Sequence, residues 1–228
     1  NRIGEDLGVR GWRVDEQRRL LSVLQDAENR RRASGARRRQ RGHKQCVQSV
    51  GSQGRGEIDR GSGSNRVGME NAGFYYLMES LQLERLVAAV MAVAGAESAL
   101  EATLQYMHER EAFGRPIAKF QALRHKAADL ATEVEVAKEF VYSTCWKYIH
   151  GEVVVKECSM AKLYTSEMQK RVVDGCLQFF GGYGYIEDYP ICRAYRDVRV
   201  GTIAGGTSEI MREIISKIVV DGVGYKKV

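Results

Sequence analysis

Residues 74–108 read FYYLMESLQLERLVAAVMAVAGAESALEATLQYMH, and this stretch decides the fold. Apolar and small residues recur in it at steps of three and four, which places them on one face of an α-helix. The recurring positions are Leu77, Leu81, Ala88, Met91, Ala92, Gly95, Ala99, Ala102 and Tyr106. Small side chains on a helix face allow a second helix to approach closely. The stretch therefore predicts one long helix that packs against other helices.

A turn follows this helix. Residues 113–116 read FGRP, and they interrupt the helical pattern because Pro and the residue before it are disfavoured inside a helix. The pattern then resumes, and it predicts long helices over residues 120–149 and 154–180. Gly151 follows the first of these helices, where glycine suits a C-terminal cap.

The C-terminal part predicts shorter helices. One covers residues 191–197, and the last starts after Thr207 and ends near residues 221–222. The Thr207 hydroxyl is suited to accept a free backbone N–H of the first turn. No segment of note after residue 66 has the period of a strand. The predicted fold class is therefore all-α, an antiparallel up-down helix bundle.

Residues 1–65 differ from the rest in composition. They contain no Phe, Tyr or Pro, they are rich in Arg, Gly and Ser, and they hold the positive surplus of a chain whose net charge is +6. Such a segment buries too little apolar surface to offset the entropy of the chain. We therefore predict a basic segment over residues 1–65, disordered or read out of frame, and a helical domain over residues 66–222.

Other classes of partner find little support in the composition. Arginine runs neutralise phosphates, but no interleaved aromatic residues accompany them, so a solvated basic tail is preferred to a nucleic-acid binder. No uninterrupted apolar run reaches the length of a membrane span. Five cysteines without a C-x-x-C pair indicate reduced thiols. The histidines of the predicted helices lack metal-ligand spacing. We therefore expect no nucleic acid, no membrane span and no metal.

Four sequence signatures occur in a fixed order after residue 64. The last three are EREAFGRPI followed by Phe120 and Gln121, QFFGGYGY at residues 178–185, and YRDVR followed by GTSEI at residues 206–210. A first, NRVG, leads into the domain at residues 65–68. Together they span about 155 residues, and they resemble the C-terminal helical domain of the FAD-dependent acyl-CoA dehydrogenases. The resemblance implies a helical domain of that family.

The resemblance also implies a reaction. These enzymes oxidise an acyl-CoA thioester to the trans-2-enoyl-CoA: a carboxylate removes the α-proton, the β-hydrogen leaves as hydride to FAD, and electrons pass to an electron-transfer flavoprotein. The cofactor supplies the redox step, and the protein supplies position and a base. Such an enzyme is expected in bacterial cytoplasm, or in the mitochondrial matrix of a eukaryote.

Glu84 is the candidate base. The commoner family pattern has Glu immediately before the Gly-Thr pair of the last signature, where this chain has Gly205. A minority, similar to the isovaleryl-CoA and long-chain enzymes, places the base on the first helix in a motif that ends Glu-Arg-Leu, as residues 84–86 do. A Glu on a helix is most often a solvated surface charge. The apolar neighbours of Glu84 and the missing side chain at Gly205 favour the catalytic interpretation.

The resemblance assigns further roles residue by residue. Arg85 matches a position that contacts the CoA portion of the substrate, the alternative being a surface arginine bonded to a neighbouring acid. Gly205 and Gly206 match positions next to and within the last signature that the resemblance assigns to substrate binding. The positions that match FAD contacts are Arg110, Phe113, Gln121, Gln178, Gly181, Gly182, Thr207, Ser208 and Glu209. The glycine pairs are also explained by plain helix termination.

Family members form at least a dimer, commonly a dimer of dimers, because several of these residues serve the FAD of the neighbouring subunit. A full member also has an N-terminal helical domain and a β-sheet domain, which residues 1–65 do not resemble. We therefore expect a fragment that binds FAD weakly or not at all. The alternatives are an acyl-CoA oxidase and a non-catalytic helical oligomerisation module.

Overall fold

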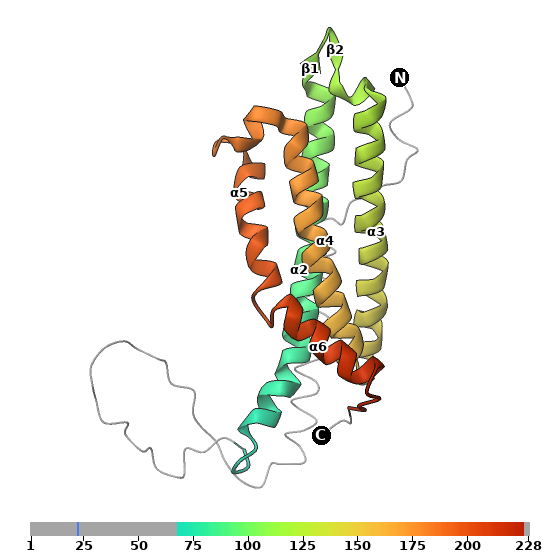
Figure 1. The fold of residues 1–228 in the computed structure, drawn as a ribbon, viewed down its shortest axis with the longest axis vertical. Coiled ribbons are helices and arrows are strands. Elements are labelled where there is room, and N and C mark those ends of the chain that lie inside the picture. Colours follow the sequence, from blue (N-terminus) through green and yellow to red (C-terminus); the bar gives the residue numbers. More distant parts are fainter. Residues whose placement is uncertain (1–21, 23–67, 226–228) are drawn as a thin grey trace, which may run out of the picture.

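The fold is a bundle of long helices. The computed structural model describes residue 22 and residues 68–225, so the predictions for residues 1–65 lie, apart from Ser22, outside the described residues. Within residues 68–225, α2 (Gly73–Glu109), α3 (Gln121–Ile149) and α4 (Val155–Phe180) lie side by side, and α3 runs antiparallel to the other two (Figure 1). The all-α up-down bundle predicted from the sequence is confirmed.

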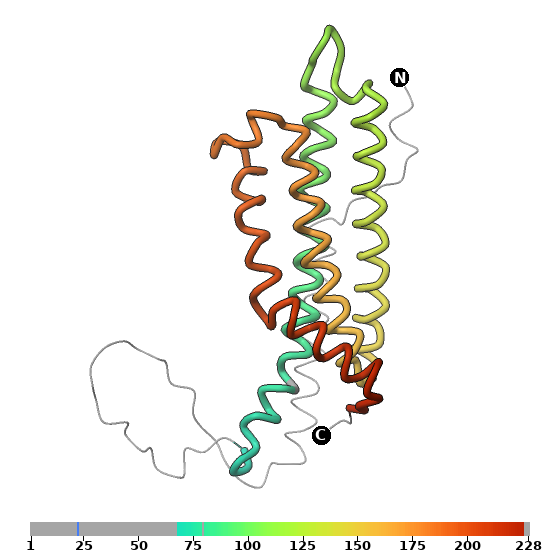
Figure 2. Tube along the Cα trace, in the orientation of Figure 1, coloured from blue at the N-terminus to red at the C-terminus, as the bar shows by residue number. Residues whose placement is uncertain are grey.

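Shorter elements complete the bundle. The chain turns at the end of α4 through the 3₁₀ helix η3 (Gly181–Tyr185), and α5 (Pro190–Asp197) then runs back beside α4. A second 3₁₀ helix, η4 (Val198–Thr202), leads to α6 (Ser208–Val219). Figure 2 shows α6 crossing the long helices at the end of the bundle opposite the α2–α3 turn. The predicted helices 120–149, 154–180 and 191–197 match α3, α4 and α5 to within one residue at each end.

The face that α2 buries agrees only in part with the predicted face. Ala92 and Ala99 are buried as predicted, but Leu77 and Met91, two other predicted positions, are 55% and 58% exposed. The apolar and small side chains that α2 buries are Leu86, Ala89, Val90, Ala92, Val93, Ala94, Ala96, Ala99, Leu100, Thr103 and Met107. Apolar residues surround most of this helix, so spacing alone does not select one face.

α2 also packs closely against α4. Gly95 lies where an added Cβ would be 2.3 Å from Nε2 of Gln169 on α4. Of the described helices, only α2 is long and apolar enough to cross a membrane, and 56% of its most apolar window is buried inside the bundle. Since core helices of globular proteins have the same length and composition, burial in the bundle accounts for its apolar sequence.

A small hairpin joins α2 to α3. β1 (Glu111–Ala112) and β2 (Arg115–Pro116) pair antiparallel, and the 3₁₀ helix η2 (Ile117–Lys119) follows. The turn residues Phe113 and Gly114 have φ of 54° and 76°, both in the left-handed region that a tight hairpin turn uses. The sequence predicted only a turn here, because strands of two residues are too short to show alternation.

Candidate functional site

The predicted site residues fall into two clusters. Glu84 and Arg85 lie on α2 near the Gly205–Gly206 loop, whereas Arg110 follows the last residue of α2 at the other end of the bundle. Residues 84 and 110 are 26 positions apart, which corresponds to about 39 Å along a helix at about 1.5 Å per residue. We call these clusters the loop end and the aromatic end.

At the loop end, two cations donate hydrogen bonds to successive carbonyl groups. Arg85 Nε donates to the Gly205 carbonyl at 3.4 Å, and Lys162 Nζ donates to the Gly206 carbonyl at 2.5 Å. Arg85 is 7% exposed and Lys162 is 1% exposed. The surface alternative for Arg85 is therefore wrong, because its guanidinium is buried and bonds the backbone. The predicted contact of Arg85 with CoA stays a prediction.

The charge at this end is unusual for a protein interior. Burial lowers the pKa of Lys162, and the nearby positive charge of Arg85 lowers it further. Burial also lowers the pKa of Arg85. Within residues 68–225, no carboxylate lies within ion-pair distance of either cation. Buried cations are usually paired with acids, so these two are held by backbone carbonyls instead.

Sequence reasoning missed Lys162. The signal was present, because Lys162 interrupts a row of α4 residues that are otherwise small or apolar and that the bundle buries. The row consists of Cys158, Ala161, Thr165, Met168, Val172 and Cys176. A lysine in such a row needs a partner in the interior.

The two glycines of the loop differ in their surroundings. Gly205 has φ +67° and an added Cβ there would meet no described heavy atom within 4 Å. Gly206 has φ +103°, and its added Cβ would lie 2.7 Å from Met211 Cε. A side chain at Gly206 would thus require the end of Met211 to shift, whereas one at Gly205 would not displace a described neighbour. Glu84, one residue before Arg85, is exposed, and the open space at Gly205 is what the Glu84 hypothesis requires.

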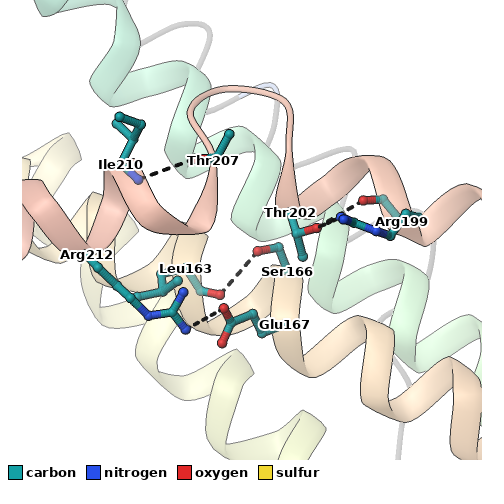
Figure 3. Close-up of polar contacts among 8 residues, drawn as sticks. All are labelled: Leu163, Ser166, Glu167, Arg199, Thr202, Thr207, Ile210 and Arg212. Carbon is teal, nitrogen blue, oxygen red and sulfur yellow. Dashed lines mark hydrogen bonds and ion pairs between the residues drawn. The ribbon is translucent and has the colours of Figure 1, made fainter.

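α6 begins directly after this loop. The Thr207 hydroxyl accepts the N–H of Ile210 at 3.4 Å, which confirms the predicted cap (Figure 3). Ser208 is buried, and its Oγ has no hydrogen-bond partner among the described residues. The backbone N–H of Glu209 and the Thr207 hydroxyl lower the pKa of the Glu209 carboxyl. The start of α6 therefore has polar groups with unused capacity to bind.

A cleft of about 810 Å³ opens beside this helix start. Thr207, Ser208 and Glu209 line it together with Arg199 of η4 and residues of α4. Figure 3 shows its flanks, where Arg199 bonds the Thr202 hydroxyl and Arg212 pairs with Glu167 at 2.6 Å. The Arg212–Glu167 ion pair joins α6 to α4, whereas the Arg199–Thr202 hydrogen bond lies within η4.

At the aromatic end, a second cleft of about 530 Å³ brings together four of the predicted FAD contacts, Arg110, Gln178, Gly181 and Gly182. The Arg110 guanidinium carbon lies 5.1 Å from the ring centroid of Tyr183. No carboxylate of residues 68–225 pairs with Arg110. An added Cβ at either glycine would meet open space, so backbone is accessible on this side.

Aromatic rings line the same cleft. Tyr106 and Phe180 stack with centroids 4.1 Å apart, and Tyr183 lies beside them on η3. Tyr106 was not predicted as a site residue, since it has the spacing of a core position. Phe113 is 95% exposed at the hairpin tip, and exposed Gln121 begins α3. Neither lines this cleft, so the structure does not gather all six predicted residues of this end.

These residues fit the group that the resemblance implies. An arginine without an acid partner and open glycine backbone suit phosphate oxygens, and the ring faces suit a flat aromatic system. The buried Ser208 hydroxyl offers a further polar contact at the loop end. Among the described residues, no group of three His, Cys, Asp or Glu side chains is placed to hold a metal ion.

The bundle and its two clusters define a helical domain of the acyl-CoA dehydrogenase type. The family described as acyl-CoA dehydrogenase, C-terminal domain, matches residues 71–220, and the chain belongs to this family. It is 44% identical over 154 residues to the mitochondrial long-chain specific acyl-CoA dehydrogenase of Sus scrofa, covering 68% of this chain and 36% of that protein. It is 38% identical over 154 residues to the mitochondrial isovaleryl-CoA dehydrogenase of Pongo abelii, with the same two coverages.

Solved structures agree. The acyl-CoA dehydrogenase from Geobacillus kaustophilus matches with a TM-score of 0.68 and 43% identity, over 69% of this chain and 41% of that one. PigA with FAD and proline matches with a TM-score of 0.65 and 29% identity, over 68% of this chain and 40% of that one. The chain thus spans about two fifths of the length of these relatives.

Proposed function

We propose that residues 66–222 form the C-terminal helical domain of an FAD-dependent acyl-CoA dehydrogenase, with Glu84 as the base. The observation that carries the proposal is the pairing at the loop end. Arg85, the neighbour of Glu84, bonds the Gly205 carbonyl, and Gly205 leaves space where a side chain would otherwise stand. A carboxylate from α2 can use this space, which a Glu at residue 205 would fill.

In this proposal the Glu84 carboxylate accepts the α-proton of an acyl-CoA thioester. A positioned general base contributes about 10²–10⁴-fold in rate. The Gly205–Gly206 loop, held by Arg85 and Lys162, shapes the wall next to the reacting carbons. FAD, when bound, supplies the acceptor for the hydride that leaves the β-carbon.

We assign the binding of FAD to residues at both ends. Arg110 and Gln178 donate to phosphate and ring oxygens, and Gly181 and Gly182 let the backbone approach closely. Thr207, Ser208 and Glu209 contribute at the start of α6, where free N–H groups favour an anion. We also assign Phe113 at the hairpin tip and Gln121 at the start of α3 to the binding of FAD. The FAD complexes of PigA among the related structures support the choice of cofactor.

The separation of the two ends supports a homo-oligomer. About 39 Å along α2 separates the assigned residues, so one compact ligand does not reach both from a single chain. A second copy that brings its aromatic end to the loop end of the first would complete the site. We therefore propose a dimer or a dimer of dimers, since closed symmetric assemblies are the usual outcome of such pairing.

Relatives support the electron acceptor and the substrate class. The caffeyl-CoA reductase–Etf complex subunit CarC of Acetobacterium woodii is 41% identical over 152 residues, so we propose an electron-transfer flavoprotein as partner. The long-chain and isovaleryl relatives favour an acyl-CoA substrate of one of those types. Relatives from mitochondria and from Bacillus subtilis are compatible with either predicted location.

A second candidate is the same chemistry in the opposite direction. The 3-(aryl)acrylate reductase of Clostridium sporogenes is 42% identical over 153 residues. Reduction of a conjugated acyl double bond uses the same base as an acid and the same hydride path reversed. Supplying an enoyl-CoA with reduced flavin, in place of an acyl-CoA with oxidised flavin, separates the two directions.

The test is the absorption spectrum of the purified chain with added FAD, before and after an acyl-CoA. We expect the chain to bind FAD weakly or not at all. Any flavin that it does bind should bleach with substrate, and Glu84→Gln should keep that flavin but not bleach it. A flavin that binds and never bleaches with any acyl-CoA or enoyl-CoA would contradict the proposal. Oxygen consumption in the same cuvette would indicate an oxidase instead.

A further inference from the structure

Lys162 is the buried cation that the proposed chemistry does not use. It lies on α4, it is 1% exposed, and its Nζ reaches the Gly206 carbonyl 44 residues further along the chain. Removing a charge from water costs several kcal/mol unless other groups compensate. One hydrogen bond to a carbonyl offsets this cost only in part, so the residue is a poor choice for stability alone.

Arg85 repeats the arrangement from a second helix. It lies on α2, it is 7% exposed, and it donates to the preceding carbonyl, that of Gly205. The positive charges of Arg85 and Lys162 repel each other, yet both side chains bond to the same loop. Two helices thus hold two consecutive peptide groups from the inside.

The planarity of the peptide bond turns these contacts into an orientation. In a trans peptide the N–H points opposite to the C=O of the same unit, and the described residues contain no cis peptide bond. Because the carbonyls of Gly205 and Gly206 point toward the cations, the N–H groups of Gly206 and Thr207 point away from them. The cations therefore determine which face of the loop presents donors to the site beside Glu84.

We propose that Lys162 is a positioning residue, which together with Arg85 fixes the two carbonyls of the Gly205–Gly206 loop and so sets its place relative to Glu84. This inference rests on the proposed function, because the position of the loop matters for catalysis only if Glu84 is the base. Loop orientation itself is measurable without any reaction.

The first test is hydrogen exchange in the whole chain with Lys162→Met. The reporters are amides bonded within or beside the loop, those of Ile203, Ala204, Ile210 and Met211. We expect their exchange to accelerate about tenfold or more, from the loss of about 1.4 kcal/mol or more, while amides of α3 keep their rates. The thermal midpoint should stay equal or rise, because replacing a buried charge with an apolar side chain is often neutral or stabilising.

Lys156→Met is the matched control, since Lys156 lies on the same helix with its side chain 44% exposed. It should change neither the loop amides nor the midpoint. Unchanged loop exchange in Lys162→Met would overturn the proposal, and so would a uniform acceleration across α2, α3 and α4. If Lys162→Met does not fold, Arg85→Met decides, with a smaller effect on the same amides because its bond is longer.

Flavin bleaching separates this inference from the proposed function. If the wild-type chain bleaches, Lys162→Met should lower the rate at saturating acyl-CoA by about 10- to 100-fold, as expected for a misplaced reacting group, and leave the half-saturating concentration within about twofold. A changed half-saturating concentration with an unchanged rate would overturn it. If flavin binds and no chain bleaches it while loop exchange responds to Lys162→Met, the proposed function fails and the positioning role stands.

Discussion

The loop end and the aromatic end hold their cations in opposite ways. At the loop end, Arg85 and Lys162 are buried and bonded to backbone carbonyls. At the aromatic end, Arg110 is exposed and rests on the ring of Tyr183, beside glycines with open space. One end is fixed from inside its own bundle, and the other is accessible to a second surface.

This difference indicates how the residues of each end are held in position. The loop end needs no partner to hold its backbone, which suits a place where a proton is moved and where small displacements are costly. The aromatic end offers donors and ring faces without an opposing wall, which suits a surface completed by another subunit. The predictions below test each end separately.

The largest effect is expected from Glu84→Gln. Removing the proposed base should lower turnover by about 10²–10⁴-fold and leave the unfolding midpoint unchanged, because Glu84 is exposed. Glu101→Gln is the control, an exposed glutamate further along α2. Rates of flavin bleaching measure both. Near-normal turnover in Glu84→Gln would contradict the assignment of Glu84 as the base.

A rescue sharpens this result. The double variant E84Q/G205E places a carboxylate where Gly205 has open space, so part of the lost rate should return. Full recovery is not expected, because a non-glycine residue at φ +67° carries strain of about 1–2 kcal/mol. Turnover no higher than in Glu84→Gln alone would mean that the space does not face the substrate.

Arg110→Gln should weaken FAD at the aromatic end. A hydrogen bond to a charged group is worth about 1.5–3 kcal/mol, so affinity should fall about 10- to 100-fold. Arg124→Gln on α3, also exposed, should bind FAD as the wild type does. Titration of flavin fluorescence checks the pair. Equal affinity in both variants would show that the phosphates bind elsewhere.

Alanine substitutions at two glycines of the aromatic end should have different effects on stability. An added Cβ at Gly184 would lie 2.8 Å from the Leu177 carbonyl oxygen, whereas at Gly182 it meets nothing within 4 Å. Gly184→Ala should therefore destabilise by about 1–3 kcal/mol, and Gly182→Ala should leave the urea midpoint in place. Equal midpoints would contradict the tight packing of η3 on α4.

The effect that is smallest near neutral pH comes from two buried thiols. Burial raises the pKa of Cys145 and of Cys158 from 9.0 to about 12. The folded state therefore favours the neutral thiols, and their contribution is fully present below about pH 9 and is lost as pH rises toward 12. Each thiol should reduce the free energy of unfolding by up to about 1.4 kcal/mol per pH unit in that range.

Urea unfolding between pH 8 and pH 11 measures this slope. Cys158→Ala should flatten it, and Cys192→Ala on α5, which is only partly buried, should not. A slope that is the same in both variants would mean that the thiols are accessible to solvent in the folded chain.

The sequence predicted the helices well because their limits depend on local chemistry. Thr207 and Gly151 mark their helix ends through a hydroxyl and a left-handed φ of 84°. On α2, spacing predicted the burial of Ala92 and Ala99 but not the exposure of Met91, because apolar residues occur around most of the helix and the buried face depends on which neighbours pack there. The hairpin at Phe113 is too short for a pattern.

The sequence predicted which residues belong to the candidate site but not how these residues are arranged in space. Motif matching named Arg85 and Gly205, and the structure bonds them across 120 residues. It did not name Lys162, although the small and apolar residues on the same face of α4 indicate that this lysine is buried. Nor did motif matching place Glu84 and Arg110 at opposite ends of the bundle, although the predicted helix over residues 74–108 separates them.

Gly95 has a consequence for how this sequence can vary. Its missing side chain lets Gln169 and α4 lie close to α2, and the two cations that bind the loop belong to these same helices. Hydrogen-bond lengths tolerate only a few tenths of an ångström, so a change in the distance between α2 and α4 would disturb both bonds to the Gly205–Gly206 loop. Residue 95 can therefore vary only where the Gln169 amide turns aside to make room and neither helix moves.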